Sequence, residues 1–497
     1  MKRLFLFFAL CSSLSAATQP DSAKAPKDKP NVLVIIADDL GYADIGVHGG
    51  KEVPTPNIDA LAASGVRCTS GYVSAPYCSP SRAGFLTGKA ATRFGHEFNP
   101  HVGDEAKLGL PLDQRTIANV MHDAGYATAL VGKWHQGFDE AHHPQSRGFD
   151  DYFGFLVGGH NFLLHKDAEP KFGTAHSHDL IYRGREVQRL DGYTTDLFTD
   201  EALSFMNRNA KKPWFLYLAY NAVHTPLEIV EKHQSRLPAV VKTPGRRGYL
   251  SLLLGLDDAI GRLMAELKAK HPNTLVFFFS DNGGSGKRPF FATNTGINTP
   301  LRGDKGQTLE GGIRVPFFVS WTGQLPAGKV YDQPVSALDV LPTALAAAQS
   351  SHLAPRDEHG APPARKASDL SKTPSAKDSP QLVSRSETAT VEGVNLLPHL
   401  KGEKAEAPHD SLAWRFGPQK AIRRGKWKLV DFRDFEAKTQ SGWQLFDLDA
   451  DISESKNLAT DHPELVAELS KAWDDWNAKN IAPLWPGTPN EDPKTAK

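Results

Sequence analysis

Acidic, amide, basic and histidine side chains follow four apolar runs in this 497-residue chain. Each run has the length and composition of a buried strand. Groups that follow parallel strands gather at one edge of the sheet, where open α/β folds bind their ligands, so we expect a single site. The residues that follow the four runs are Asp38 and Asp39, Lys133 and His135, His224, and Asp281 and Asn282.

The acids and the amide in this set offer only oxygen donors to a metal. Carboxylates that gather in one place repel one another unless a cation lies between them. Oxygen ligands without sulfur or nitrogen favour a hard divalent ion, Ca²⁺ or Mg²⁺. The predicted metal ligands are Asp38, Asp39, Asp281 and Asn282.

Basic side chains near the predicted acids supply positive charge and hydrogen-bond donors. Lys133, His135, His224 and Lys305 offer hydrogen-bond donors and acid–base groups that can surround an anion. A metal together with a ring of cations suits a substrate that carries a tetrahedral oxyanion. We expect the nucleophile to lie among these groups.

A cysteine motif carries the most specific signal. Cys78-Ser79-Pro80-Ser81-Arg82 shortly precedes Leu86-Thr87-Gly88, and this pattern resembles the signature of type I sulfatases, in which the cysteine is oxidised to formylglycine. The resemblance covers nearly the whole chain after residue 30 and looks nearest to bacterial carbohydrate sulfatases such as N-acetylgalactosamine-6-sulfatase-like enzymes. The other matching segments are ADDLGYAD (37–44), GKWHQG (132–137), VHTPL (223–227), FSDNGG (279–284), KGQTLEGGIRVP (305–316) and WQLFDLDADISESKNLA (443–459).

The resemblance implies a role for each matching residue. Cys78, converted to formylglycine (3-oxoalanine), would be the nucleophile, Arg82 would hold it, and His135 would act on its hydrate. One Ca²⁺ per chain would be bound by Asp38, Asp39, Asp281, Asn282 and residue 78. Sulfate would be contacted by Lys133, His224 and Lys305.

This chemistry explains why a cysteine stands where other hydrolases have serine. An aldehyde hydrate has two hydroxyls: one can attack sulfur, and the other can then expel sulfate as the C=O forms again. A serine ester could not be released by that elimination. Because a sugar alkoxide is a poor leaving group, we expect His224, with Lys305 nearby, to protonate it. His135 would take the proton from the second hydroxyl.

Two residues depart from the family pattern, and two loops suggest sugar contacts. Gln136 stands where leucine is commoner, and Phe85 where leucine is usual. Both flank the chemical residues, so they put substrate preference in doubt. His96, in the segment 93–99, and His160, in the segment 158–161, could hydrogen-bond sugar hydroxyls near the mouth of the site, or be structural loop residues.

The elements around these residues predict an α/β fold with a mostly parallel sheet between helices. The resemblance to sulfatases implies that this sheet is arranged as in alkaline phosphatase. After the main sheet, 421–432 and 443–448 read as two strands of a small antiparallel sheet, and 462–477 as a helix with one apolar face. The predicted strands of the main sheet are 32–37, 127–131, 214–220 and 275–280, and the predicted helices are 57–64, 116–124, 196–209 and 249–268.

Composition shifts divide the chain. Residues 1–17 combine Lys2 and Arg3, an apolar run and a small-residue end, which predicts a secretory signal and a periplasmic or secreted protein. We expect no membrane span. The expected organisation is a signal peptide (1–17), a polar lead-in (18–30), a catalytic domain (31–349), a low-complexity linker or insertion (350–390) and a C-terminal α+β subdomain (391–497).

The charge balance and the site residues narrow the functional classes. With 57 basic and 57 acidic residues, no overall positive field exists to hold a nucleic acid. The expected partners are a sulfated galactose or N-acetylgalactosamine glycan and the enzyme that matures Cys78, either formylglycine-generating or anaerobic. Two alternatives stay open: a phosphate-ester hydrolase of the alkaline-phosphatase superfamily, and a non-catalytic protein that binds sulfated glycans.

Overall fold

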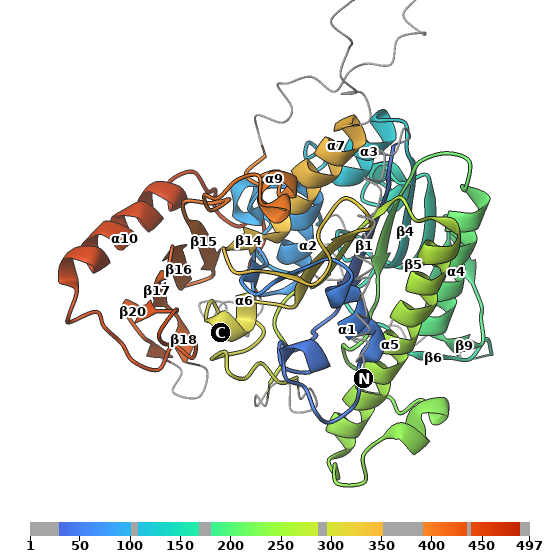
Figure 1. The fold of residues 1–497 in the computed structure, drawn as a ribbon, viewed down its shortest axis with the longest axis horizontal. Coiled ribbons are helices and arrows are strands. Elements are labelled where there is room, and N and C mark those ends of the chain that lie inside the picture. The colour runs from blue at the N-terminus through green and yellow to red at the C-terminus, as the bar shows by residue number, and fades with distance from the viewer. Residues whose placement is uncertain are drawn as a thin grey trace, which may run out of the picture.

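A ten-stranded sheet forms the centre of the computed structural model, which describes residues 29–100, 108–167, 180–286, 296–350, 391–434 and 439–487 (Figure 1). The strand order is β13-β2-β12-β11-β1-β10-β4-β5-β7-β8. Five neighbouring strands, β11 to β5, run parallel, while β12, β2, β7 and β8 bring antiparallel pairings to the flanks. The mostly parallel α/β sheet predicted from the sequence is confirmed. The five parallel strands are β11 (Thr274–Ser280), β1 (Asn31–Ala37), β10 (Trp214–Ala219), β4 (Ala127–Lys133) and β5 (Asp151–Phe155).

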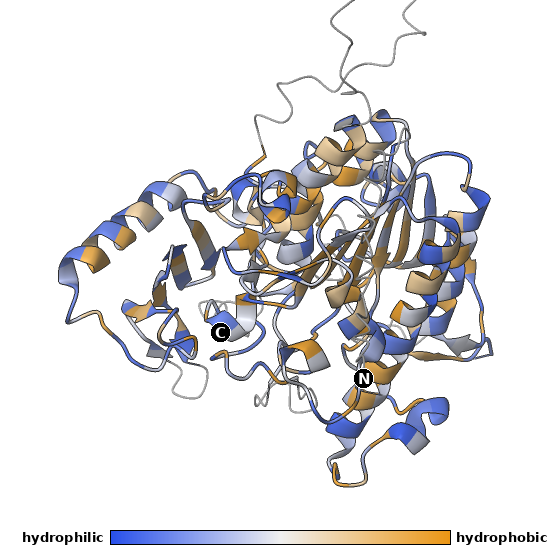
Figure 2. Ribbon diagram, viewed as in Figure 1, coloured by the Kyte–Doolittle hydropathy of each residue, from blue (hydrophilic) through white to orange (hydrophobic). Residues whose placement is uncertain are grey.

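Helices cover both faces of this sheet. Successive residues of β1 alternate between two apolar clusters: Val34 and Ile36 pack into one, and Leu33 and Ile35 into the other. This double burial explains why the strands read as unbroken apolar runs, which are orange in Figure 2. One face carries α1 (Pro56–Ala63), α4 (Thr194–Arg208) and α5 (Pro244–Lys270), and the other α2 (Cys78–Thr87), α3 (Ile117–Asp123) and α7 (Val340–Ser350).

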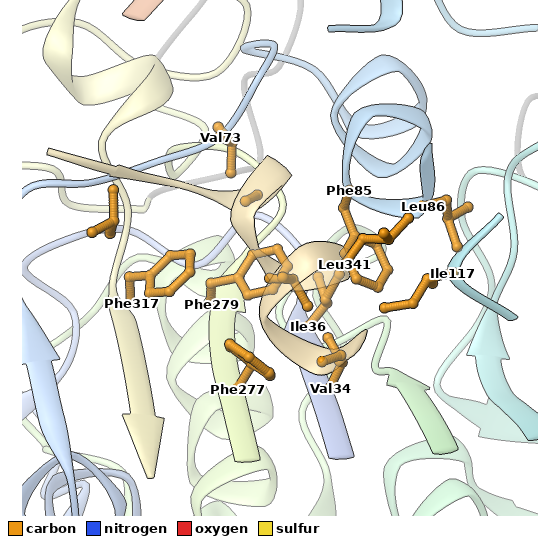
Figure 3. Close-up of a cluster of buried hydrophobic side chains, with 14 of the residues drawn as sticks. Val34, Ile36, Val73, Phe85, Leu86, Ile117, Phe277, Phe279, Phe317 and Leu341 are labelled. Carbon is orange, nitrogen blue, oxygen red and sulfur yellow. The ribbon is translucent and has the colours of Figure 1, made fainter. Parts of the chain in front are cut away.

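The helix that begins at Cys78 is held firmly on the sheet. Phe85, on α2, packs its ring 5.1 Å from that of Tyr217 and 5.8 Å from that of Phe279. Figure 3 shows Phe85 and Leu86 above the side chains of the central strands. Burial of rings and branched side chains at this point fixes the position of the first turn of α2 relative to the strand ends.

The C-terminal part forms a four-stranded antiparallel sheet with one long helix. The predicted single strand at 421–432 is wrong: it is a hairpin that turns at Gly425, whose φ of 54° suits glycine. The predicted helix and its apolar face are confirmed, since Leu469 and Trp473 are buried against the sheet. The elements are β15 (Leu412–Phe416), β16 (Gln419–Arg424), β17 (Trp427–Asp431), β20 (Gln444–Asp447) and α10 (Pro463–Asn477).

A buried ionic cluster joins the two parts. Lys428, on β17, lies 2.9 Å from Glu310 of α6 (Glu310–Ile313) and 2.8 Å from Glu454, and all three side chains are fully buried. Glu454 also accepts a hydrogen bond from the main-chain N–H of Glu310 at 2.7 Å. This cluster ties the C-terminal sheet to the segment that follows Lys305.

Shorter elements complete the described chain. No helix in these residues is long and apolar enough to cross a membrane. The predicted signal peptide, the lead-in up to residue 28 and the linker from 351 to 390 lie outside the described residues. The remaining strands are β2 (Val66–Cys68), β3 (Gly71–Tyr72), β6 (Leu163–Leu164), β7 (Ile181–Arg183), β8 (Glu186–Gln188), β9 (Gly192–Tyr193), β12 (Phe317–Trp321), β13 (Lys329–Tyr331), β14 (Val335–Ser336), β18 (Arg433–Asp434) and β19 (Thr439–Gln440), and the remaining helices are η1 (Gly46–His48), η2 (Ala91–Phe94), η3 (Pro144–Arg147), η4 (Glu231–Arg236), η5 (Ala337–Asp339) and α9 (Leu397–Lys401).

Candidate active site

The four strands that precede the chemical residues are neighbours in the sheet. They lie in the order β11, β1, β10 and β4, all parallel, so their carboxyl ends meet. Pairing continues past the strand ends: the N–H of Asp38 donates to Ala222 O at 2.9 Å, and the N–H of Asp281 to Ala37 O at 3.1 Å. Ligand atoms of Asp38, Asp39, Cys78 and His224 lie within 4.8 Å of one another.

Two lysines hold two of the carboxylates. The Lys133 ammonium lies 2.7 Å from Asp38 Oδ2, and the Lys305 ammonium 2.7 Å from Asp39 Oδ1. Asp39 Oδ1 also accepts from Asn282 Nδ2 at 2.7 Å. Burial and the charge of Asp281 raise the pKa of Asp38 to about 7, against the effect of Lys133 and Arg82. Asp38 is therefore the carboxylate whose ionised form these cations stabilise least.

Arg82 joins α2, the helix that begins at Cys78, to the end of β11. Its Nε and one terminal nitrogen lie 2.9 and 2.8 Å from Asp281 Oδ2, with both side chains fully buried. Burial acts to raise the pKa of Asp281, but Arg82 and the two lysines lower this pKa to about 2. Asp281 is thus held as a carboxylate.

Cys78 begins α2 at the centre of this group. Its side chain is buried, and Sγ lies 3.8 Å from Asp38 Oδ1. Burial raises the pKa of the Cys78 thiol to about 12, so the unmodified residue is a protonated, weakly nucleophilic thiol. Cys68 and Cys78 are both buried, free thiols that form no disulfide with each other.

His224 follows β10 and faces the acids. Its Nδ1 lies 2.8 Å from the carbonyl oxygen of Thr225, which can only accept, so Nδ1 carries a hydrogen. Its Nε2 lies 3.7 Å from Asp39 Oδ2. Burial lowers the pKa of His224 to about 3 despite the opposing charge of Asp39, and the ring is therefore neutral with the Nε2 lone pair toward the site.

His135 follows β4, the strand on the far side of β10 from β1. Its main chain has a φ of 57°, the left-handed region, and its N–H donates to Leu156 O at 3.0 Å. Burial and then the charges of Lys133, Arg82 and Lys305 lower the pKa of His135 well below its usual value. These surroundings therefore favour the neutral imidazole of His135, which has a lone pair that can accept a proton.

The donors present fit a hard divalent cation. Asp38, Asp39 and Asp281 offer carboxylate oxygens, and Asn282 Oδ1 is buried with no hydrogen-bond partner among the described residues. A buried carbonyl oxygen without a partner is costly, and a cation would satisfy it. His224 also belongs to the group of possible metal donors, which the sequence did not predict.

Four residues lie deeper than the sequence suggested. His96 and His160 are fully buried: Nε2 of His96 lies 2.6 Å from Ser79 Oγ, and the ring of His160 lies 4.9 Å from that of Phe155. Gln136 and Phe85 are also fully buried. Gln136 and Phe85 are thus interior residues beside the chemical groups, and any bearing of the two on substrate preference stays a prediction, as do sugar contacts of His96 and His160.

Sequence reasoning overlooked two neighbours of His135. Ser79 Oγ donates to the carbonyl oxygen of His135 at 2.6 Å. A Cβ on Gly158 would lie 2.6 Å from His135 Cε1 and 2.7 Å from Nε2, so the imidazole occupies the space that this glycine leaves. The motif marks Ser79 as part of C-x-P-S-R, but nothing in its spacing indicates the partner.

Comparison with known proteins agrees with this geometry. Residues 30–350 match the family described as Sulfatase. The N-acetylgalactosamine-6-sulfatase of Canis lupus familiaris is 34% identical over 343 residues, 66% of this chain and 63% of that protein, so the chain spans less than two thirds of that relative. The uncharacterized sulfatase YdeN of Escherichia coli (strain K12) is 30% identical over 443 residues, 78% of this chain and 69% of that protein.

A solved structure is similar over almost the whole length. The crystal structure of Ps i-CgsB in complex with k-i-k-neocarrahexaose superposes with a TM-score of 0.77 at 32% identity, covering 92% of this chain and 95% of that chain. The family match covers more than half of the sequence and includes every residue of the site. The chain therefore belongs to the sulfatase family.

Proposed function

We propose that this protein hydrolyses sulfate monoesters. The observation that carries the proposal is Cys78 at the start of α2, within 4.8 Å of ligand atoms of Asp38, Asp39 and His224. A cysteine whose thiol is protonated needs conversion before it can act, and the C-x-P-S-R sequence around it is the pattern that sulfatases convert. The three acids beside it suit a cation that would meet an anionic ester.

When present, Ca²⁺ held by Asp38, Asp39, Asp281 and Asn282 would draw charge from sulfate oxygens, and formylglycine at position 78 would supply a hydrated aldehyde as the oxygen nucleophile. Side chains of the protein would bind the sulfate group and hold the metal ligands. Lys133 and Lys305 each use one of three ammonium donors on a carboxylate, which leaves donors for the non-bridging sulfate oxygens. Arg82 holds Asp281 as a carboxylate for the cation.

The two histidines move the protons. We assign protonation of the leaving alcohol to His224, because its Nε2 faces the acids while its Nδ1 is fixed on Thr225 O. The negative charge of a bound sulfate ester would favour the imidazolium that this step needs. We assign removal of the proton from the second hydroxyl of the hydrate to His135, whose surroundings keep the ring neutral.

The proposed substrate is an O-sulfate on galactose or N-acetylgalactosamine in a glycan. The named relatives support this class: one acts, by its name, on N-acetylgalactosamine 6-sulfate, and another was crystallised with a neocarrahexaose. We further propose that residues 1–17 direct export, that the protein is periplasmic or secreted, and that a formylglycine-generating or anaerobic maturating enzyme converts Cys78.

A substrate panel tests the proposal. Galactose singly sulfated at the 2, 3, 4 or 6 position and N-acetylgalactosamine singly sulfated at the 3, 4 or 6 position, free and in disaccharides, are incubated with the matured protein, and free sulfate is measured. We expect multiple turnovers on at least one compound. His224 among the possible metal donors is the one observation that favours the phosphatase alternative, so phosphorylated sugars with added Zn²⁺ are the comparison. Release of phosphate but not sulfate would overturn the proposal.

A further inference from the structure

A buried carboxamide lies between the two halves of the site. Gln136 is fully buried, and its Nε2 lies 2.9 Å from Ser79 O, 2.9 Å from His135 O and 3.2 Å from Ser79 Oγ. The two carbonyl oxygens can only accept, so the atom that faces them is the amide nitrogen. A single side chain thus joins the first turn of α2 to the segment that follows β4.

Ser79 completes this connection. Its hydroxyl has one hydrogen, and the 2.6 Å contact with His135 O requires it. His96 Nε2 also lies 2.6 Å from Ser79 Oγ, so the imidazole packs against the same hydroxyl. Burial lowers the pKa of His96 to about 3, so the ring is neutral. Asn99 Oδ1 accepts from the N–H of Ser79 at 3.0 Å and holds the same turn of the helix.

The main chain of His135 needs such support. A φ of 57° is disfavoured for a residue with a Cβ, by about 1 kcal/mol or more. The carbonyl oxygen of His135 receives both Ser79 Oγ–H and Gln136 Nε2–H, and its N–H is bonded to Leu156 O. These contacts fix both peptide groups of His135, while Gly158 leaves space for its ring.

We infer that Gln136 is a positioning residue: together with Ser79 it holds the His135 main chain against the first turn of α2, and so sets the imidazole relative to position 78. This inference rests on the proposed function, because it gives His135 a part in sulfate hydrolysis. Gln136 itself touches neither the acids nor the lysines in any contact of the described structure. Its side chain acts through the residue before it.

The test introduces Gln136→Leu into the wild-type protein and into the His135→Ala variant. Leucine keeps the volume and removes the donors. Rates on 4-nitrophenyl sulfate are divided by the fraction of chains in which mass spectrometry shows residue 78 converted. We expect kcat to fall by about 10- to 100-fold with little change in KM, as for a misplaced catalytic group. In a His135→Ala background the same change should cost less than about twofold, because the group it positions is gone.

Thr128→Val is the matched control. Thr128 is a fully buried residue at the opposite end of the same strand, and its hydroxyl contacts Gly148 O at 2.8 Å and the N–H of Asp150 at 2.9 Å. Its loss should lower stability and leave kcat within about twofold of the wild type. An equal loss of kcat from Gln136→Leu in both backgrounds, or no loss in either, would overturn the inference.

A second readout does not need turnover. In ¹⁵N–¹H spectra of histidine-labelled protein, with the His135 signals assigned by their absence in His135→Ala, Gln136→Leu should shift those signals and Thr128→Val should not. Unchanged His135 signals in Gln136→Leu would also overturn the inference. If converted wild-type protein releases no sulfate from any ester, the proposed function has failed, and the spectra alone decide the positioning claim.

Discussion

Arg82 lies one helical turn after Cys78 and places its guanidinium 2.8 Å from the Asp281 carboxylate, with both side chains fully buried. The pair joins the start of α2 to the end of β11, two segments about 200 residues apart in sequence. It therefore fixes the position of Cys78 relative to the predicted metal ligands. The same contact keeps Asp281 ionised and positions the start of α2.

Loss of this arginine should destabilise the fold. Arg82→Met leaves Asp281 as a buried carboxylate without its partner, which costs roughly 3–5 kcal/mol. Urea unfolding of the metal-free protein measures the loss. Arg236→Met is the control, because Arg236 lies 2.6 Å from Asp258 with side chains 36% and 38% exposed, and such pairs contribute about 1 kcal/mol or less. An equal loss in both variants would contradict the structural role of Arg82.

Removal of the metal should abolish activity. Chelation should inactivate the protein, and Ca²⁺ should restore it better than Zn²⁺, because the four predicted ligands offer only oxygen. Asp38→Ala and Asp281→Ala should lose bound calcium, measured by elemental analysis, together with turnover. Asp257→Ala is the control: this acid caps α1 through the N–H of Ile58 at 2.9 Å. Full calcium content in either site variant would show that the ligands are wrongly assigned.

Gly158 should be important for kcat because the His135 ring occupies the space that a side chain at position 158 would fill. In Gly158→Ala the new Cβ would lie 2.6 Å from the His135 ring, closer than atoms can approach, so the imidazole must move. We expect kcat to fall by about 10- to 100-fold, as for a misplaced catalytic group. Gly261→Ala is the control, since its Cβ would meet the Asn57 side chain at 2.7 Å where α5 packs on α1, away from His135. Similar rates for the two variants would contradict this prediction.

The strands and the polar residues at their ends could be predicted from the sequence because the signal is local. The run 32–37 and the acids after it need no knowledge of the rest of the chain, and the structure places β1 at Asn31–Ala37. Adjacent parallel strands then bring Asp38 and Asp281 together by the geometry of the sheet alone.

Contacts between segments that are distant in the sequence could not be predicted from local sequence patterns. Gln136 differs from the commoner leucine by a polar group whose partner, Ser79, lies 57 residues away. The cluster of Glu310, Lys428 and Glu454 needs three segments to meet before any charge is balanced. The hairpin at 419–431 was hidden because Gly425 is the only break in an otherwise strand-like run. Each depends on tertiary packing that spacing along the chain does not encode.

The two histidines should respond differently to the leaving group. His224→Ala should slow hydrolysis of a sulfated sugar by roughly 10²–10⁴-fold but cost much less on 4-nitrophenyl sulfate, whose phenolate departs without a proton. His135→Ala should cost about the same on both substrates, because its step does not depend on the alcohol that has left. Initial rates of both variants on both substrates check this. A selective loss for His135→Ala with equal losses for His224→Ala would mean that the roles are reversed.

The proposed mechanism requires that Cys78 is converted to formylglycine. In active protein, mass spectrometry should find the peptide that carries residue 78 about 18 Da lighter than its thiol form, since the modification replaces a thiol with an aldehyde. Fully active protein that contains only free Cys78 would contradict this expectation.

The most direct measurement is sulfate release by the wild-type protein and by Cys78→Ser on the sulfated sugar that the panel selects. Serine has the size to keep the fold but lacks the second hydroxyl of an aldehyde hydrate. We predict many turnovers for the wild type and at most about one sulfate per chain for Cys78→Ser, because a serine ester has no route to release by elimination. Undiminished multiple turnover by Cys78→Ser would contradict the account.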